Sequence, residues 1–143
     1  MTAKALVRRV TADDFTPLHE ITGDPREQGR VCTLVSQEHG GSTDIMVGLA
    51  RFDAGESRRP HHHPNASEAY VVLSGELVIH IDGEDITAGY GTAVYVPPNV
   101  VHSIRNDSDA PAEVLWTFNL PERSDHGLVY DEDVWPGLAG ETR

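Results

Sequence analysis

Cysteine is almost absent from this sequence of 143 residues, because Cys32 is the only one. A single thiol can form no internal disulfide and no Cys-x-x-Cys metal or redox site. Cys32 lies within the apolar run 31–35, so we expect it to be a small buried hydrophobe. The sequence therefore excludes a disulfide-rich scaffold, and it supplies no thiolate cluster for a structural zinc ion.

Basic residues are also few: there are 11 Lys and Arg against 23 Asp and Glu, which leaves a net charge of −12. A strongly acidic chain is repelled by nucleic acids and by anionic membrane surfaces, so neither is an expected partner. Anionic small molecules are not excluded, because a bound metal ion can reverse the sign of the charge locally. We therefore expect a small-molecule partner.

Long apolar runs are missing as well. No stretch approaches the roughly 20 consecutive apolar residues that a membrane-spanning helix requires. Residues 1–10 lack the apolar centre of a secretory signal peptide. We therefore expect a cytoplasmic protein that does not enter a membrane.

No long segment shows a helical period, whereas 13 Gly and 9 Pro punctuate the chain. Such frequent turn signals separate short elements and favour an all-β domain, either a sandwich or a barrel. We expect an N-terminal arm over residues 1–30, one barrel over 31–121 and a tail over 122–143. We expect about eight barrel strands: the histidine strand and those over residues 31–36, 44–52, 67–73, 76–82, 92–96, 100–105 and 112–119, with a short further piece at 85–87.

Three consecutive histidines, His61, His62 and His63, are the most informative feature of the chain. In a strand, alternate side chains share a face, so His61 and His63 project to one side and His62 to the other. Pro64 and the following asparagine form a turn, after which the next strand could return Glu68 to the same place. Two imidazoles and a carboxylate are a common ligand set for a divalent transition metal.

His102 is the candidate fourth ligand. It follows the sequence Pro97-Pro98-Asn99, and prolines restrict the backbone there. A rigid turn would hold the imidazole in place, which a metal site requires within a few tenths of an ångström.

The two histidine segments resemble the motifs of the cupin family. The first motif, G-x5-H-x-H-x4-E-x6-G, is matched at every position, by Gly55, His61, His63, Glu68 and Gly75. The second, G-x5-P-x-G-x2-H-x3-N, is matched by Gly91, Pro97, His102 and Asn106. Asn99 replaces the middle glycine of the second motif, and asparagine tolerates left-handed backbone better than most residues.

The resemblance implies an antiparallel jelly-roll β-barrel that holds one metal ion through His61, His63, Glu68 and His102. Such a set leaves two positions open on an octahedral ion, and its nitrogen and oxygen ligands admit Fe, Mn, Ni, Co, Cu or Zn. Cupins include dioxygenases, decarboxylases, isomerases, cyclases, lyases and binding modules. We favour a dioxygenase-like enzyme in which Glu68 is both ligand and catalytic base. A metal-dependent cyclase, isomerase or dehydratase is the alternative, as is a binding or sensor module.

Three residues near the motifs are candidates for substrate binding: Tyr70, Trp116 and Arg59. Tyr70 shares a face with Glu68, and it could either line a pocket or pack in the core. Trp116 alternates with two other apolar residues on the last strand, where core packing competes with an aromatic pocket wall. Arg59 could bind a carboxylate, although we expect Arg58 and Arg59 to be a solvated pair.

The two ends of the chain suggest contacts beyond the barrel. Exposed sheet edges require protection, and small cupins are commonly dimers, so we expect a homodimer to which residues before Asp44 contribute. The acidic tail carries Leu128, Tyr130, Val134 and Trp135, which would be unusual in a solvated segment. We expect these side chains to dock, either on the barrel or on a partner chain, or to cover the pocket mouth as a lid.

Overall fold

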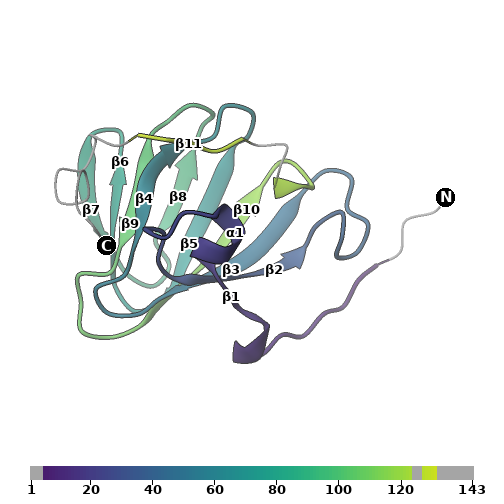
Figure 1. Ribbon diagram of the computed structural model, residues 1–143, viewed down its shortest axis with the longest axis horizontal. Coiled ribbons are helices and arrows are strands. Elements are labelled where there is room, and N and C mark those ends of the chain that lie inside the picture. The colour runs from purple at the N-terminus through teal and green to yellow at the C-terminus, as the bar shows by residue number, and fades with distance from the viewer. Residues whose placement is uncertain (1–4, 124–126, 132–143) are drawn as a thin grey trace.

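The computed structural model describes residues 5–123 and 127–131 of the chain. Its strands form two antiparallel sheets that enclose one core (Figure 1). The first sheet has the order β1-β2-β3-β10-β5-β8 and the second the order β11-β4-β9-β6-β7. The expected all-β, antiparallel barrel is confirmed.

The strands of the first sheet are β1 (Thr16–Pro17), β2 (Arg30–Val35), β3 (Met46–Phe52), β10 (Ala112–Phe118), β5 (Glu68–Ser74) and β8 (Ala93–Val96). Those of the second are β11 (Val129–Tyr130), β4 (Ser57–His62), β9 (His102–Arg105), β6 (Leu77–Ile81) and β7 (Glu84–Ala88). Two short helical elements precede β2, the 3-10 turn η1 (Ala12–Asp14) and the helix α1 (Leu18–Thr22).

Sequence alternation predicted which side chains enter the core. On β10 every second residue is buried, including Val114, Trp116 and Phe118. On β6 the same period buries Leu77 and Ile79. Cys32 is buried, as expected. Period-2 patterning works here because each strand has one face against the core and one face toward solvent.

The turns of the two motifs explain their residue types. Asn99, which stands in place of a glycine, has a φ of 70° and is therefore left-handed. Asparagine is one of the few residues with a side chain that tolerate this conformation. Asn106 supports another turn from a buried position, where its Nδ2 donates hydrogen bonds to the carbonyl oxygens of Phe52 and Ala110 at 2.9 and 2.7 Å. Asn99 and Asn106 therefore have structural roles in turns of the barrel.

Sequence patterns missed three elements: β1, α1 and β11. β1 and β11 have two residues each and α1 has five, little more than one helical turn, so none of them can show its period. β1 pairs with β2 at one edge of the first sheet, and β11 pairs with β4 at one edge of the second. The homodimer stays a prediction.

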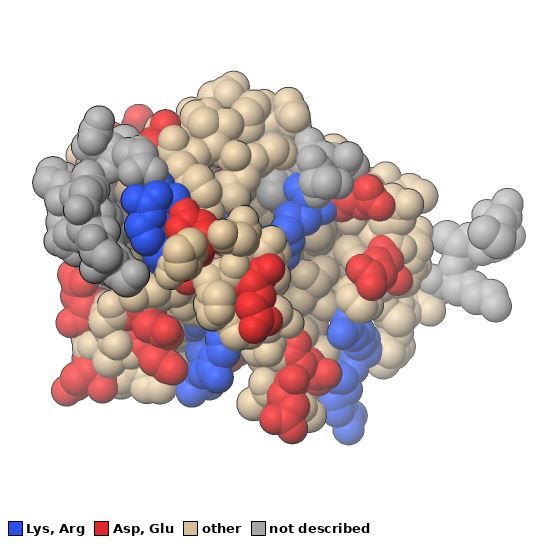
Figure 2. Space-filling model, viewed as in Figure 1, with Lys and Arg blue, Asp and Glu red and all other residues tan. Residues whose placement is uncertain are grey.

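Acidic side chains are spread over the face shown in Figure 2, with basic side chains interspersed among them. The exposed ion pair between Arg30 and Asp53 is an example, and pairs of this kind contribute little to stability. Within the described residues, no helix has the length and apolar content needed to cross a bilayer.

Candidate metal centre

Three histidines from two neighbouring strands meet inside the barrel. His61 near the end of β4 lies directly opposite His102 at the start of β9, and His63 follows β4. One ring nitrogen from each lies within 4.8 Å of the others. The three residues are only 2%, 3% and 2% exposed in the order His61, His63, His102, so their side chains are shielded from bulk water.

Backbone carbonyl oxygens hold the Nδ1 proton of all three rings. In each ring, Nδ1 lies close to a carbonyl oxygen, at 2.6 Å for His61, 2.6 Å for His63 and 3.0 Å for His102. A carbonyl oxygen can only accept, so Nδ1 carries a proton in each ring, and Nε2 of His61 and of His63 keeps a lone pair. Nε2 of His102 faces the Glu68 carboxylate at 3.0 Å and donates to it when no cation is bound. The three carbonyl acceptors belong to Arg59, Gly127 and Val100 respectively. This arrangement orients the three Nε2 atoms for a metal ion.

Glu68 adds a carboxylate from the opposite sheet, at the start of β5. Its Oε1 lies 3.0 Å from Nε2 of His102 and 3.8 Å from Nε2 of His63. Without a cation, a proton on Nε2 of His102 joins the two groups; a bound cation would replace that proton, and both atoms would then offer lone pairs to it. A shared cation would compensate both, and three imidazoles with one carboxylate suit a divalent first-row metal. The donor set therefore fits the metal that the motifs imply.

Burial and charge favour the ligand forms of these groups. Burial, followed by the positive charge of Arg58, holds the pKa of His61 well below its usual value. His61 is therefore a neutral imidazole near pH 7. Burial alone would raise the pKa of Glu68, but the contact with His102 and the nearby positive charges outweigh it and lower that pKa. Glu68 is therefore ionised.

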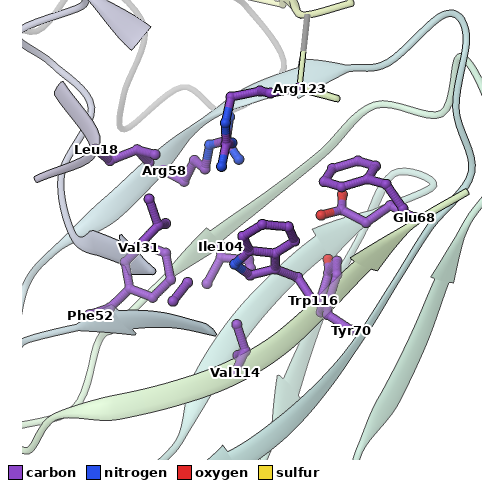
Figure 3. Close-up of a pocket in the computed structure, with 12 residues that line it drawn as sticks. Leu18, Val31, Phe52, Arg58, Glu68, Tyr70, Ile104, Val114, Trp116 and Arg123 are labelled. Carbon is purple, nitrogen blue, oxygen red and sulfur yellow. The ribbon is translucent and has the colours of Figure 1, made fainter. Parts of the chain in front are cut away.

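A narrow cavity of about 30 Å³ lies beside the cluster, which is room for one or two waters (Figure 3). Glu68, Tyr70 and Trp116 all line it, so the structure places both aromatic candidates at the cavity wall as well as in the core. The Tyr70 hydroxyl and Trp116 Nε1 are buried and make no hydrogen bond to the described residues. Burial and the charge of Glu68 raise the pKa of Tyr70, which keeps its proton available for donation.

The expectation of a solvated pair at Arg58 and Arg59 is wrong. Arg59 turns away from the cavity, pairs with Asp24 and covers the ring of Tyr130 at 3.9 Å. Arg58 does line the cavity, but its Nε donates to Oε2 of Glu27 at 3.0 Å. The segment before β2 packs against β4 and covers both side chains, which local sequence could not indicate.

Glu27 is the supporting residue that the sequence did not reveal. It is 1% exposed, and its Oε1 accepts a hydrogen bond from the backbone N–H of Arg59 at 2.6 Å. Its Oε2 also accepts from the hydroxyl of Tyr130 at 3.2 Å. One carboxylate thus joins the N-terminal segment, the strand β4 and the tail. In the sequence it is one acidic residue in a polar loop, with no pattern to distinguish it.

We expect Glu27→Gln to lower the free energy of unfolding, because it removes contacts that hold the N-terminal segment against β4. The amide keeps the size but removes the charge opposite Arg58, and leaving a buried charge without its partner costs about 3–5 kcal/mol. Urea unfolding of the metal-free protein measures this loss. Glu20→Gln, on the exposed side of α1, is the matched control and should change the free energy of unfolding by less than about 0.5 kcal/mol. Equal stability of both variants would contradict the role of Glu27.

The start of the tail pairs with β4, the strand that carries His61. Val129 and Tyr130 pair with His62 and His61, and Asp131 Oδ2 lies 2.7 Å from Nδ1 of His62. His62 therefore packs under the tail and faces away from the cluster. Residues 127–131 dock on the barrel of their own chain. Val134 and Trp135 lie outside the described residues, so the lid stays a prediction.

Comparison with known proteins agrees with the motifs. The family model described as "Cupin domain" matches residues 48–118. TcmJ of Streptomyces glaucescens, a tetracenomycin polyketide synthase protein, is 26% identical over 131 residues, which are 91% of this chain and 84% of TcmJ. The β-D-galactosidase Rv1717 of Mycobacterium tuberculosis is 33% identical over 106 residues, which are 73% of this chain and 84% of that protein.

A solved structure agrees with the fold. Recombinant oxalate oxidase in complex with glycolate matches with a TM-score of 0.63 and 23% identity, over 74% of this chain and 56% of the oxidase chain. At that identity the likeness concerns the fold alone. Together, the matched family model, the relative at 33% identity and the two-sheet barrel show that the chain is a member of the cupin family.

Proposed function

We propose that this cupin is a metal-dependent enzyme that cyclises, dehydrates or isomerises a small ketone-bearing molecule without redox chemistry. The ligands are His61, His63, Glu68 and His102. The observation that carries the proposal is the orientation of the imidazoles, because three backbone carbonyls hold their Nε2 atoms toward one point. A structural role for the histidines would need no such common direction. A bound divalent ion would supply Lewis acidity to a ketone or enol oxygen.

The residues around the site provide the remaining chemistry. Glu68 is ionised and buried next to His102, so it is the candidate base for a proton on carbon beside the ketone. Tyr70 offers a buried hydroxyl, which can donate a hydrogen bond to a developing oxyanion. Because the cavity is narrow and enclosed by apolar side chains, it excludes bulk water from the reacting atoms.

The nature of the substrate is supported by the lining of the cavity and by one relative. Most lining residues are apolar or aromatic, including Phe52, Trp116 and Phe118, and a cavity of about 30 Å³ admits only a small group, which suits a ketone-bearing end with few hydroxyl groups. TcmJ is named for a polyketide synthase, and polyketides are rich in enolisable ketones. The name of the galactosidase relative points elsewhere, but a sugar needs more polar partners than this cavity provides.

A dioxygenase-like reaction is the second candidate function. It is favoured by the intact set of three histidines and one glutamate, which leaves open positions on the ion. Both candidates begin with the same proton abstraction, so the requirement for dioxygen distinguishes them. A binding or sensor module would instead bind ligand without turnover.

The test uses protein reconstituted separately with zinc and with iron, and diketone substrates such as triacetate methyl ester. We expect loss of the ketone signal with zinc under argon, abolition by chelation, and at least a 100-fold lower kcat in Glu68→Gln. Glu76→Gln, at an exposed turn residue that lines neither pocket, is the control and should keep full kcat. Turnover only with iron and with dioxygen uptake would favour the dioxygenase. Ligand-induced stabilisation without any turnover would favour the binding module.

A further inference from the structure

Arg123 stands between the inner cavity and an outer pocket. It follows β10, and it lines both the cavity beside the histidine cluster and an open pocket of about 300 Å³. Figure 3 shows its side chain reaching into the cavity, with Arg58 beside it, the Trp116 indole beneath it and Glu68 on the same side. A molecule that extends from the histidine cluster to the outer pocket must therefore pass the guanidinium of Arg123.

The two arginines at the cavity differ in their partners. Arg58 is neutralised by Glu27 at 3.0 Å, in a pair that is almost inaccessible to solvent. Among the described residues Arg123 donates to a hydroxyl, Thr33 Oγ1 at 3.3 Å, and its Cζ lies 5.4 Å from the Trp116 ring. Within residues 5–123 and 127–131 it forms no ion pair with a carboxylate.

A partly buried guanidinium without a carboxylate partner is costly, because it loses water without gaining a counter-charge. Burial, and then the charge of Arg58, lower the pKa of Arg123 to about 10 against the opposing effect of the Glu68 charge, so it remains charged at neutral pH. The nearby Nε1 of Trp116 is a second buried donor without a hydrogen-bond partner among the described residues. Glu38 and Glu122 also line the outer pocket, but among the described residues neither forms an ion pair with Arg123, so its guanidinium keeps donors for an anion.

We propose that Arg123 binds a carboxylate of the substrate, so that the enzyme selects keto acids whose carboxylate lies beyond the metal-binding oxygens. The inference rests on the proposed function, since it places the ketone end at the histidine cluster. A guanidinium matches a carboxylate with two parallel hydrogen bonds, which gives both affinity and orientation. The inner cavity holds the reacting end, and the outer pocket accommodates the remainder of the chain.

The test compares triacetate, a diketone that ends in a carboxylate, with its methyl ester on zinc-loaded protein. Titration calorimetry should show at least tenfold tighter binding of the acid than of the ester. Arg123→Gln should weaken binding of the acid at least tenfold and leave the affinity for the ester unchanged. Arg123→Lys should retain part of the preference for the acid. Arg30→Gln removes the same charge from an exposed ion pair with Asp53, and it should change the affinity for neither ligand.

Each outcome separates the inference from the proposed function. Equal affinity of acid and ester in the wild type overturns the role of Arg123 but leaves the ketone site standing. Equal weakening of both ligands by Arg123→Gln also overturns it, since that indicates a packing role. Binding of the ester that persists after chelation contradicts the metal-dependent site, and failure of both ligands to bind contradicts both proposals. Thermal unfolding of each variant confirms that the protein compared is folded.

Discussion

His63→Ala should lose its metal, with a fall in affinity of more than about 100-fold. His63 is 3% exposed, its Nδ1 lies 2.6 Å from the Gly127 carbonyl oxygen, and its Nε2 lies 3.8 Å from Oε1 of Glu68. Loss of a residue that merely supports a ligand costs about 10–100-fold in affinity. Removal of the ligand itself should cost more. Elemental analysis after dialysis against a weak chelator measures the retained metal.

His62→Ala is the matched control, because it removes the same side chain from the adjacent position. His62 faces the other side of β4, where its Nδ1 lies 2.7 Å from Asp131. Its loss should leave metal content unchanged and weaken only the docking of residues 127–131. If both variants lost metal equally, the assignment of faces along β4 would be wrong, because a shift of one residue exchanges the two faces of a strand.

Gly48→Ala should destabilise the protein by about 2–4 kcal/mol. Gly48 in β3 lies opposite Trp116 in β10, and a Cβ at this position would lie 2.1 Å from Cζ2 of the indole. It would also lie 2.6 Å from the backbone oxygen of Cys32. Rotation of the indole relieves only the first contact, because the second atom belongs to the paired strand β2. The added methyl group must therefore separate strands or displace the cavity wall.

Urea unfolding of the metal-free form measures this effect without interference from metal binding. Gly89→Ala is the control, because nothing lies within 4 Å of its added Cβ and its backbone is not left-handed. That variant should stay within about 0.5 kcal/mol of the parent protein. A Gly48→Ala variant of parental stability would show that Trp116 moves freely, and the cavity would then be wider than the structure indicates.

The ligand residues and the barrel could be predicted from the sequence because both depend on local spacing. Alternation along a strand separates His61 and His63 from His62, and motif spacing identified Glu68 and His102. Short alternating segments between glycines and prolines predicted eight of the strands to within about two residues, and indicated β7 only as a short further piece. Asn99 was correctly expected to tolerate a left-handed turn, since that property belongs to the residue type.

The surroundings of the site were decided by tertiary structure. Glu27 is 31 residues from Arg58, and Tyr130 is 103 residues from Glu27, yet these groups meet on β4. The expected solvated pair, Arg58 and Arg59, is covered by segments whose approach depends on the folded sheets. The place of Arg123 at the cavity likewise depends on the folded sheets. Local spacing determines which way a side chain points from its own strand, whereas packing of distant segments determines what it meets there.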